Sequence, residues 1–272
     1  MILLSIFIFI IGLAIGSFLN VCIYRLPCEE SLFYPPSHCP ECGSSIRWFD
    51  NIPLISYLLL KGRCRSCKKP ISFQYPSVEA ATGFLFLFAF LRYSLNSSII
   101  PIFPLLKDLF LISFLIPIFF IDLKHQIIPN SLSYPLIISG VILSFLQRTL
   151  LSSAAGIGIG GGALFLIYFI GSHLLKEESM GMGDIKLSMG IGAFLGGEKT
   201  LLFLFLSFII GGIFAAIFLL LHLKKKREKI PFAPFLTVSA LISIFFGDKL
   251  IYLYLNSFFL VSILSSCEGF IS

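Results

Sequence analysis

Long apolar runs dominate the chain, and short polar segments separate them. A helix that crosses a bilayer needs about 20 mostly apolar residues. Seven runs are long enough by this measure: 2–20, 77–94, 101–121, 131–147, 154–175, 200–223 and 231–247. An eighth, shorter apolar run, 185–197, predicts a helix that is thin, tilted or partly buried. A last run, 250–266, could add a ninth span at the C-terminus.

The composition also points to lipid as the main solvent of this chain. Hydrophobic residues make up 57% of it and charged residues only 12%, with a mean hydropathy of +0.97, whereas soluble domains carry roughly 25% charged residues. No positive charge precedes the first run, as it would in a secretory signal peptide, so we expect residues 2–20 to remain as a span. We therefore predict an all-α polytopic membrane protein with about eight transmembrane helices in a lipid bilayer.

The positions of Lys and Arg predict how the helices are oriented. If 185–197 crosses the membrane, fifteen of the 20 Lys and Arg fall on one side, in the segments 21–76, 122–130, 176–186 and 224–230. The other five are Arg92, Lys107, Arg148, Lys199 and Lys249. By the positive-inside rule, the first side is cytoplasmic. The net charge of +6 then reflects membrane orientation and, at 224–227, an anchor for anionic lipids, so we expect no nucleic-acid binding.

This topology divides the chain into four parts. Residues 1–20 form the first span, 21–76 a cytoplasmic segment, 77–247 the main transmembrane domain, and 248–272 a C-terminal extension that could hold an extra span. A segment as short as 21–76 is small for a self-sufficient hydrophobic core, so an additional cross-link would stabilise it.

Four cysteines in that segment have the spacing of a zinc site. Cys39 and Cys42 form one Cys-x-x-Cys pair, Cys64 and Cys67 form a second, and 21 residues lie between the two pairs. Four thiolates around a tetrahedral Zn²⁺ make a closed, structural site. The alternative is two unrelated pairs of reduced or redox-active thiols. The remaining cysteines, expected to be buried, interfacial or lipid-facing, are Cys22, Cys28 and Cys267.

Two aspartates lie at the ends of apolar runs. Asp122 ends one run and Asp184 begins another, both at cytoplasmic ends of predicted spans. An ionisable group at the edge of the hydrocarbon is costly and indicates function. Two carboxylates in reach can share a proton and act as general base and general acid. Gly181 and Gly183 favour this interpretation, because glycines permit a close backbone approach beside the carboxylate.

The alternative is a purely structural role, in which each aspartate only caps the helix at whose end it lies and pairs with Lys124 or Lys186. Within the catalytic interpretation, the helix dipole favours an anion at a helix N-terminus and disfavours one at a C-terminus. We therefore expect Asp184 to carry the charge and Asp122 the shared proton.

Three further polar residues lie at the cytoplasmic ends of the first two spans. Glu79 is either a first-turn acid favoured by the helix dipole or a residue that binds a methyl donor or a substrate amine, and Asn20 and Arg25 carry the same ambiguity. Small residues four apart, Gly156 with Gly160 and Gly158 with Gly162, predict a helix-packing surface.

Several short stretches form an ordered set of motifs: 16–21 (GSFLNV), 24–27 (YRLP), both cysteine pairs, 50–53 (DNIP), 56–58 (SYL), 62–65 (GRCR), 121–122 with 128–130 (ID and IPN), 181–187 (GMGDIKL) and 230–235 (IPFAPF). In these stretches the chain resembles the type 4 prepilin leader peptidase/N-methyltransferase family over residues 9–240. Ala233 takes the place of a Gly that is usual in that family.

The resemblance implies a membrane aspartic peptidase with a GxGD motif at 181–184, whose catalytic residues are Asp122 and Asp184. Its implied substrates are prepilins and the pseudopilins of type II secretion, cleaved on the cytoplasmic side of the bacterial inner membrane. The new N-terminus is then methylated from S-adenosylmethionine, and the four cysteines hold the metal. Two alternatives are a peptidase without methyltransferase activity and a zinc-stabilised membrane scaffold without catalysis. A transporter suits aspartates at the membrane edge less well than a midplane site would.

Overall fold

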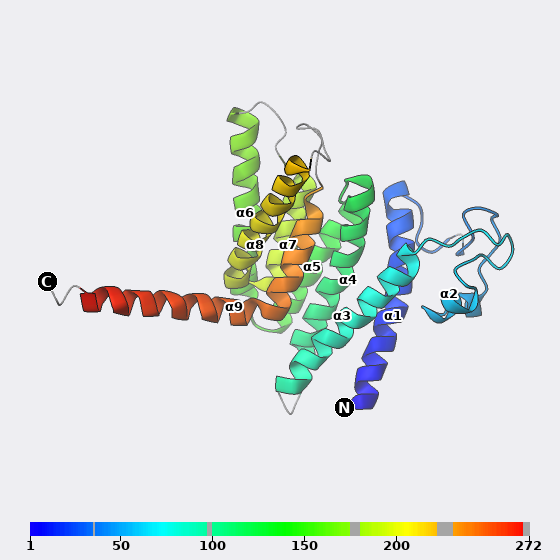
Figure 1. The fold of residues 1–272 in the computed structure, drawn as a ribbon, viewed down its shortest axis with the longest axis horizontal. Coiled ribbons are helices and arrows are strands. Elements are labelled where there is room, and N and C mark those ends of the chain that lie inside the picture. The colour runs from blue at the N-terminus through cyan, green and yellow to red at the C-terminus, as the bar shows by residue number, and fades with distance from the viewer. Residues whose placement is uncertain (35, 97–99, 175–179, 222–230, 269–272) are drawn as a thin grey trace.

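The chain folds into helices, as its apolar runs predict (Figure 1). The structure is a computed structural model that describes residues 1–34, 36–96, 100–174, 180–221 and 231–268. Within these ranges there is no β-sheet, only two isolated bridges in the cysteine-containing segment. The long helices are α1 (Ile2–Arg25), α3 (Gln74–Asn96), α4 (Ile102–His125), α5 (Asn130–Leu146), α6 (Leu150–Leu174), α7 (Met182–Leu195), α8 (Gly197–Leu220) and α9 (Ala233–Glu268); the short ones are η1 (Leu26–Cys28), η2 (Trp48–Asn51) and α2 (Ile55–Leu59).

The predicted fold class is confirmed. Six helices among the described residues, α1, α3, α4, α6, α8 and α9, are long and apolar enough to cross a membrane, and α5 is a shorter apolar helix. Many large apolar side chains on these helices stay exposed, such as Phe7, Phe84 and Leu151. Exposed apolar side chains on long helices are the expected surface of a protein whose solvent is lipid.

The short run after Asp184 forms α7, which lies inside the bundle. Its 14 residues span only about 21 Å, less than the roughly 30 Å of a hydrocarbon core. Helices α4, α5, α6, α8 and α9 all contact it. Neighbouring helices therefore cover α7 on its sides. Of the predicted alternatives, a thin, a tilted or a partly buried helix, the structure shows the buried one.

Small residues allow α6 to contact α7 at backbone distance. A Cβ on Gly156 would lie 2.1 Å from the carbonyl oxygen of Gly192, and one on Gly160 would lie 2.7 Å from that of Ser188. The predicted packing surface is therefore confirmed for Gly156 and Gly160. For Gly158 and Gly162 the prediction is wrong, because nothing lies within 4 Å of a Cβ at either position. These two glycines lie on the other side of α6.

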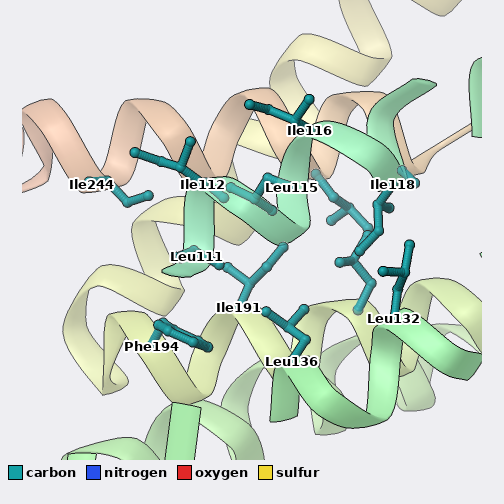
Figure 2. Close-up of a cluster of buried hydrophobic side chains, with 14 of the residues drawn as sticks. Leu111, Ile112, Leu115, Ile116, Ile118, Leu132, Leu136, Ile191, Phe194 and Ile244 are labelled. Atoms are coloured by element: carbon teal, nitrogen blue, oxygen red, sulfur yellow. The ribbon is translucent and has the colours of Figure 1, made fainter. Parts of the chain in front are cut away.

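A buried cluster of hydrophobic side chains joins the helices that carry the aspartates (Figure 2). It brings together Leu115 of α4, Leu136 of α5, Ile191 of α7 and Ile244 of α9, each at most 2% exposed. This close packing fixes the relative positions of α4, α7 and α9.

At one end of the bundle, an ion network ties α3, α4, α8 and α9 together. Arg92 pairs with Asp108 at 3.5 Å and with Asp248 at 2.7 Å, and Lys199 pairs with Asp248 at 2.8 Å. Both basic residues belong to the minority predicted for the non-cytoplasmic side. Since Lys199 follows the C-terminal end of α7 and Asp184 lies at its N-terminal end, α7 runs from one end of the bundle to the other.

The C-terminal region differs from its prediction. Residues 250–266 do not form a separate helix but continue α9 from the span at 231–247 without a break. The C-terminal part of α9, red in Figure 1, runs away from the bundle. The predicted basic anchor at 224–227 and Lys176 lie outside the described residues, as does the side chain of Cys267.

Candidate active site and metal centre

Asp122 lies in the last turn of α4, in the interior of the protein. Its side chain is buried, with the residue only 5% exposed. Gln126 caps the C-terminal end of α4: it adopts a left-handed conformation with φ 55° and donates its N–H to the Asp122 carbonyl. The carboxylate oxygen Oδ2 accepts a hydrogen bond of 3.1 Å from the backbone N–H of Ala233, the first residue of α9. Asp122 thus joins the end of α4 to the beginning of α9.

Asp184 is half-buried in the first turn of α7. Gly181 precedes this helix, and its backbone is hydrogen-bonded to the Asp184 carboxylate. Both motif glycines are closely packed: a Cβ on Gly181 would lie 3.2 Å from Oδ2 of Asp184, and one on Gly183 would lie 3.0 Å from Cβ of Ile128. Neither glycine has a positive φ. The motif therefore uses glycine for close approach rather than for backbone conformation.

The two carboxylates lie at the same end of the bundle, within range of a Coulombic interaction, although 61 residues lie between them in the sequence. The α4–α5 connection and the start of α5 help to place Asp184, since Ile128 contacts Gly183 and Asn130, the first residue of α5, accepts a 2.8 Å hydrogen bond from Lys186. Two sequence stretches thus build one site.

The capping alternative requires each aspartate to pair with a neighbouring lysine, and the described residues show neither pair. Nζ of Lys186 bonds to Oδ1 of Asn130 and lies 5.0 Å from the centre of the Tyr134 ring, rather than on Asp184. Among the described residues, no ion pair joins Asp122 to Lys124 or Asp184 to Lys186.

The contact with Ala233 also bears on which aspartate carries the shared proton. From sequence alone, the dipole at each aspartate is that of the helix which contains it. In the structure, the N-terminus of α9 faces Asp122, and a backbone N–H at a helix N-terminus favours an anion. Both aspartates therefore contact the start of a helix, and the assignment of the charge to Asp184 stays a prediction.

The four cysteines of the soluble segment come together as their spacing predicts. The sulfurs of Cys39, Cys42, Cys64 and Cys67 all lie within 4.8 Å of one another and could hold a metal ion. Sγ of Cys39 is 3.9 Å from Sγ of Cys67. Zn–S bonds of about 2.3 Å in a tetrahedron put neighbouring sulfurs about 3.8 Å apart, so the donor set fits zinc. Of the other cysteines, Cys22 is buried and Cys28 is exposed.

The two cysteine pairs sit in matching turns. In each turn the first cysteine N–H bonds to the carbonyl five residues later, Cys39 to Ser44 and Cys64 to Lys69, both at 2.9 Å. Backbone N–H groups of Cys67 and Ser66 lower the pKa of the Cys64 thiol to about 6. A thiolate is the form that binds a metal, so the turn itself favours binding.

Ion pairs hold the same segment together at its surface. Arg65 donates two hydrogen bonds to Asp50, at 2.8 and 2.6 Å, and Lys69 pairs with Glu41 across the two turns. The Arg65 guanidinium lowers the pKa of the Asp50 carboxyl below its ordinary value, mainly through these hydrogen bonds.

The other three predicted residues, Asn20, Arg25 and Glu79, line one cavity of about 610 Å³. It lies between the end of α1, the cysteine-containing segment and the start of α3, and Lys124 and His125 at the end of α4 also reach it. All three predicted residues are buried, at 3%, 5% and 8% exposure.

Each of these residues connects parts of the chain. Asn20 Nδ2 donates to the Tyr75 carbonyl at 3.1 Å, and Arg25 donates to the Ser31 carbonyl at 2.8 Å. Glu79 Oε2 accepts the N–H of Leu54 at 2.8 Å, which links α3 to the cysteine-containing segment. The reading of Glu79 as a first-turn acid is wrong, because α3 begins at Gln74 and its first turn holds no acidic residue.

Comparison with known proteins decides the family. Residues 10–93 match the bacterial peptidase A24 N-terminal domain, and residues 109–216 match the type IV leader peptidase family. A protein of Legionella pneumophila, named prepilin leader peptidase/N-methyltransferase, is 36% identical over 90% of this chain and 92% of its own length. The chain belongs to the type IV leader peptidase family. The resemblance seen in the sequence is confirmed, and with it the expectation of a multi-pass membrane protease of the bacterial inner membrane.

Further members of the type IV leader peptidase family carry the same name. A protein of Aeromonas hydrophila is 34% identical over 92% of this chain and 93% of its own length. One of Myxococcus xanthus is 38% identical, but the match covers 71% of this chain and 56% of that protein. No solved structure matches this chain.

Sequence reasoning missed several residues of the site. His125, which no sequence pattern singled out, ends α4 and lines the cavity. Ile128 and Asn130 stood in the family motif without a role, and Ala233 was only a departure from it. Their positions in the motif were the available signal; their contacts required the packing of α4 against α7 and α9.

Proposed function

We propose that this chain cleaves the leader peptides of prepilins and of the pseudopilins of type II secretion. Asp122 and Asp184 are the catalytic pair, supported by Gly181 and Gly183. The relatives that match nearly their full length are named prepilin leader peptidase/N-methyltransferase. The observation that carries the peptidase proposal is the convergence of a carboxylate from α4 and one from α7 at one end of the bundle.

This arrangement suits hydrolysis of a peptide bond. Two close carboxylates share one proton, because like charges at short range cannot both ionise. The ionised member takes a proton from water as it attacks the scissile carbonyl, and the protonated member gives its proton to the leaving amine. The Ala233 N–H and the start of α7 stabilise whichever carboxylate is charged.

In the same proposal, the new N-terminus is methylated from S-adenosylmethionine in the cavity lined by Asn20, Arg25 and Glu79. S-adenosylmethionine supplies an electrophilic methyl group. The four cysteines hold a structural Zn²⁺, which fixes the segment that closes the cavity on its soluble side. The excess of Lys and Arg at the aspartate end of the bundle supports a cytoplasmic active site.

The test uses the full chain in lipid nanodiscs with a purified prepilin. Cleavage should fall by about 100- to 10,000-fold in Asp122→Asn and in Asp184→Asn, while Asp248→Asn at the opposite end cleaves at close to the parental rate. Mass spectrometry of the cleaved pilin should show one added methyl group when S-adenosylmethionine is present. Parental cleavage in either active-site variant would refute the aspartic mechanism, and an unmodified N-terminus would refute the methyl transfer.

A further inference from the structure

Among the described residues, three acidic side chains line the cavity beside α1 and α3, and one of them has no ion pair. The three are Glu41, Asp50 and Glu79. Glu41 pairs with Lys69 and Asp50 with Arg65. Glu79 accepts hydrogen bonds from the Leu54 N–H and from Ser17, but among the described residues it has no salt bridge. A buried carboxylate without an ion pair is suited to binding a cationic ligand.

Asn20 supplies a second acceptor on the same wall. Its Nδ2 donates to the Tyr75 carbonyl, which directs Oδ1 as the remaining acceptor. Oδ1 is buried and has no hydrogen-bond partner among the described residues. Buried polar atoms of native proteins almost always have a partner, so this oxygen indicates a donor that is absent from the free protein.

The two residues lie across one helix contact. A Cβ on Gly16 of α1 would lie 2.8 Å from Cα of Glu79 on α3, so the helices touch at this level. Asn20 follows Gly16 by one helical turn, which puts the Asn20 side chain on the face of α1 that meets α3. A carboxylate and an amide oxygen on adjoining helices together present acceptors, which match a group rich in N–H.

We propose that Glu79 and Asn20 form the subsite for the α-amine of the cleaved pilin, with Glu79 as the acceptor of the proton that this amine must lose. The inference rests on the proposed methyltransferase function and assigns these residues to the pilin rather than to the methyl donor. An ammonium group carries three N–H donors, one or more of which Asn20 Oδ1 can accept. The sulfonium centre of S-adenosylmethionine carries none.

The chemistry balances without a further reagent. The pilin N-terminus arrives as an ammonium ion, the main form below a pKa of about 7.7 to 8.0, and transfers one proton to the Glu79 carboxylate. The free amine then uses its lone pair to form the new N–C bond. The methyl–sulfur bond breaks with its electrons left on sulfur, which becomes a neutral thioether. The product is a secondary ammonium, and Glu79 returns its proton to water.

The end of α4 gives the amine a short route from one site to the other. Lys124 and His125 line the cavity, and they follow the catalytic Asp122 by two and three residues. Two helical residues rise by about 3 Å. A peptide end released beside Asp122 therefore lies close to the cavity mouth.

The methyl-donor molecule also has an α-ammonium group, so the experiment must separate the two sources. The full chain is assayed in nanodiscs in three ways: cleavage of prepilin, affinity for S-adenosylhomocysteine by calorimetry, and methylation of a synthetic, already cleaved pilin peptide. Glu79→Gln keeps the acceptor for Leu54 N–H but cannot take a proton. Its methylation rate should fall at least 100-fold, with cleavage within twofold and affinity for S-adenosylhomocysteine within threefold of the parent.

Two more variants keep the proposal open to refutation. Glu79→Asp retains a carboxylate and should recover at least tenfold over Glu79→Gln. Asn20→Leu should raise the KM for the peptide at least tenfold with a smaller change in kcat. Glu30→Gln, an exposed carboxylate outside the cavity lining, is the matched control and should behave as the parent.

The outcomes separate this inference from the function on which it rests. If Glu79→Gln methylates at the parental rate, or if its main defect is weaker binding of S-adenosylhomocysteine, the assignment to the pilin amine is wrong. A His125→Gln variant that loses methylation while Glu79→Gln retains it would give the proton to His125 instead. If the parent itself neither binds S-adenosylhomocysteine nor methylates the peptide, the methyltransferase function fails and the inference fails with it.

Discussion

Oδ2 of Asp122 accepts a hydrogen bond of 3.1 Å from the backbone N–H of Ala233, a residue that follows it by 111 positions. The bond connects the C-terminal turn of α4 to the first residue of α9, in a place where both residues are buried. It gives the beginning of α9 a direct part in the electrostatics of the proposed catalytic pair.

Removing this donor should impair cleavage. Ala233→Pro deletes the N–H, and hydrogen bonds to charged groups are worth about 1.5–3 kcal/mol, so we expect prepilin cleavage to fall about 10- to 100-fold. Ala233→Gly keeps the N–H and should cleave within about threefold of the parent. Equal rates for the two variants, measured on correctly folded protein, would show that the bond has no part in catalysis.

The α6–α7 contact offers a matched pair of glycine substitutions. Gly156→Ala would place its Cβ 2.1 Å from a backbone oxygen of α7, whereas Gly158→Ala meets nothing within 4 Å. Overpacking costs about 1–3 kcal/mol, so we expect a lower midpoint of thermal unfolding and slower cleavage for Gly156→Ala. Gly158→Ala should match the parent in both measurements. A parental midpoint for Gly156→Ala would contradict the contact.

The partners of Lys186 separate catalysis from capping. Because its ammonium bonds to Asn130 rather than to Asp184, Lys186→Met should keep prepilin cleavage within about threefold, as expected for loss of an exposed polar contact. Asp184→Asn should lose cleavage by at least about 100-fold. If both variants lost cleavage to the same degree, an Asp184–Lys186 pair would be the better account.

Metal removal should affect the two activities differently. Leu54, whose N–H bonds to Glu79, lies between the two cysteine pairs in the sequence, while the aspartates lie on α4 and α7. We therefore expect chelation of zinc, or Cys64→Ser, to abolish methylation and reduce cleavage by less than about fivefold, because structural zinc stabilises the segment that it staples.

Elemental analysis provides the control for that experiment. The parent should contain about one zinc per chain, Cys64→Ser should contain little, and Cys28→Ser should keep the parental amount because Cys28 lies outside the cluster. Equal zinc contents in Cys64→Ser and the parent would disprove the four-cysteine site.

Much of this protein could be predicted from single residues and their spacing. Apolar runs marked the long helices, because a helix is the form that satisfies its own backbone in lipid. The two Cys-x-x-Cys pairs predicted a metal centre, because each tight turn presents two sulfurs together. Asp122 and Asp184 stood out because an ionisable group at the membrane edge is costly.

Tertiary packing decided the rest. In lipid, the side chains that face other helices are as apolar as those that face the bilayer, so hydrophobicity alone could not show that α7 is buried or that Gly156 packs while Gly158 does not. The N–H that Ala233 gives to Asp122 and the cavity that joins Asn20 to Glu79 depend on contacts between distant segments. The local pattern determines which helices form and which ionisable residues are energetically costly at the membrane edge. Only the packing of one helix on another determines the partners of those residues.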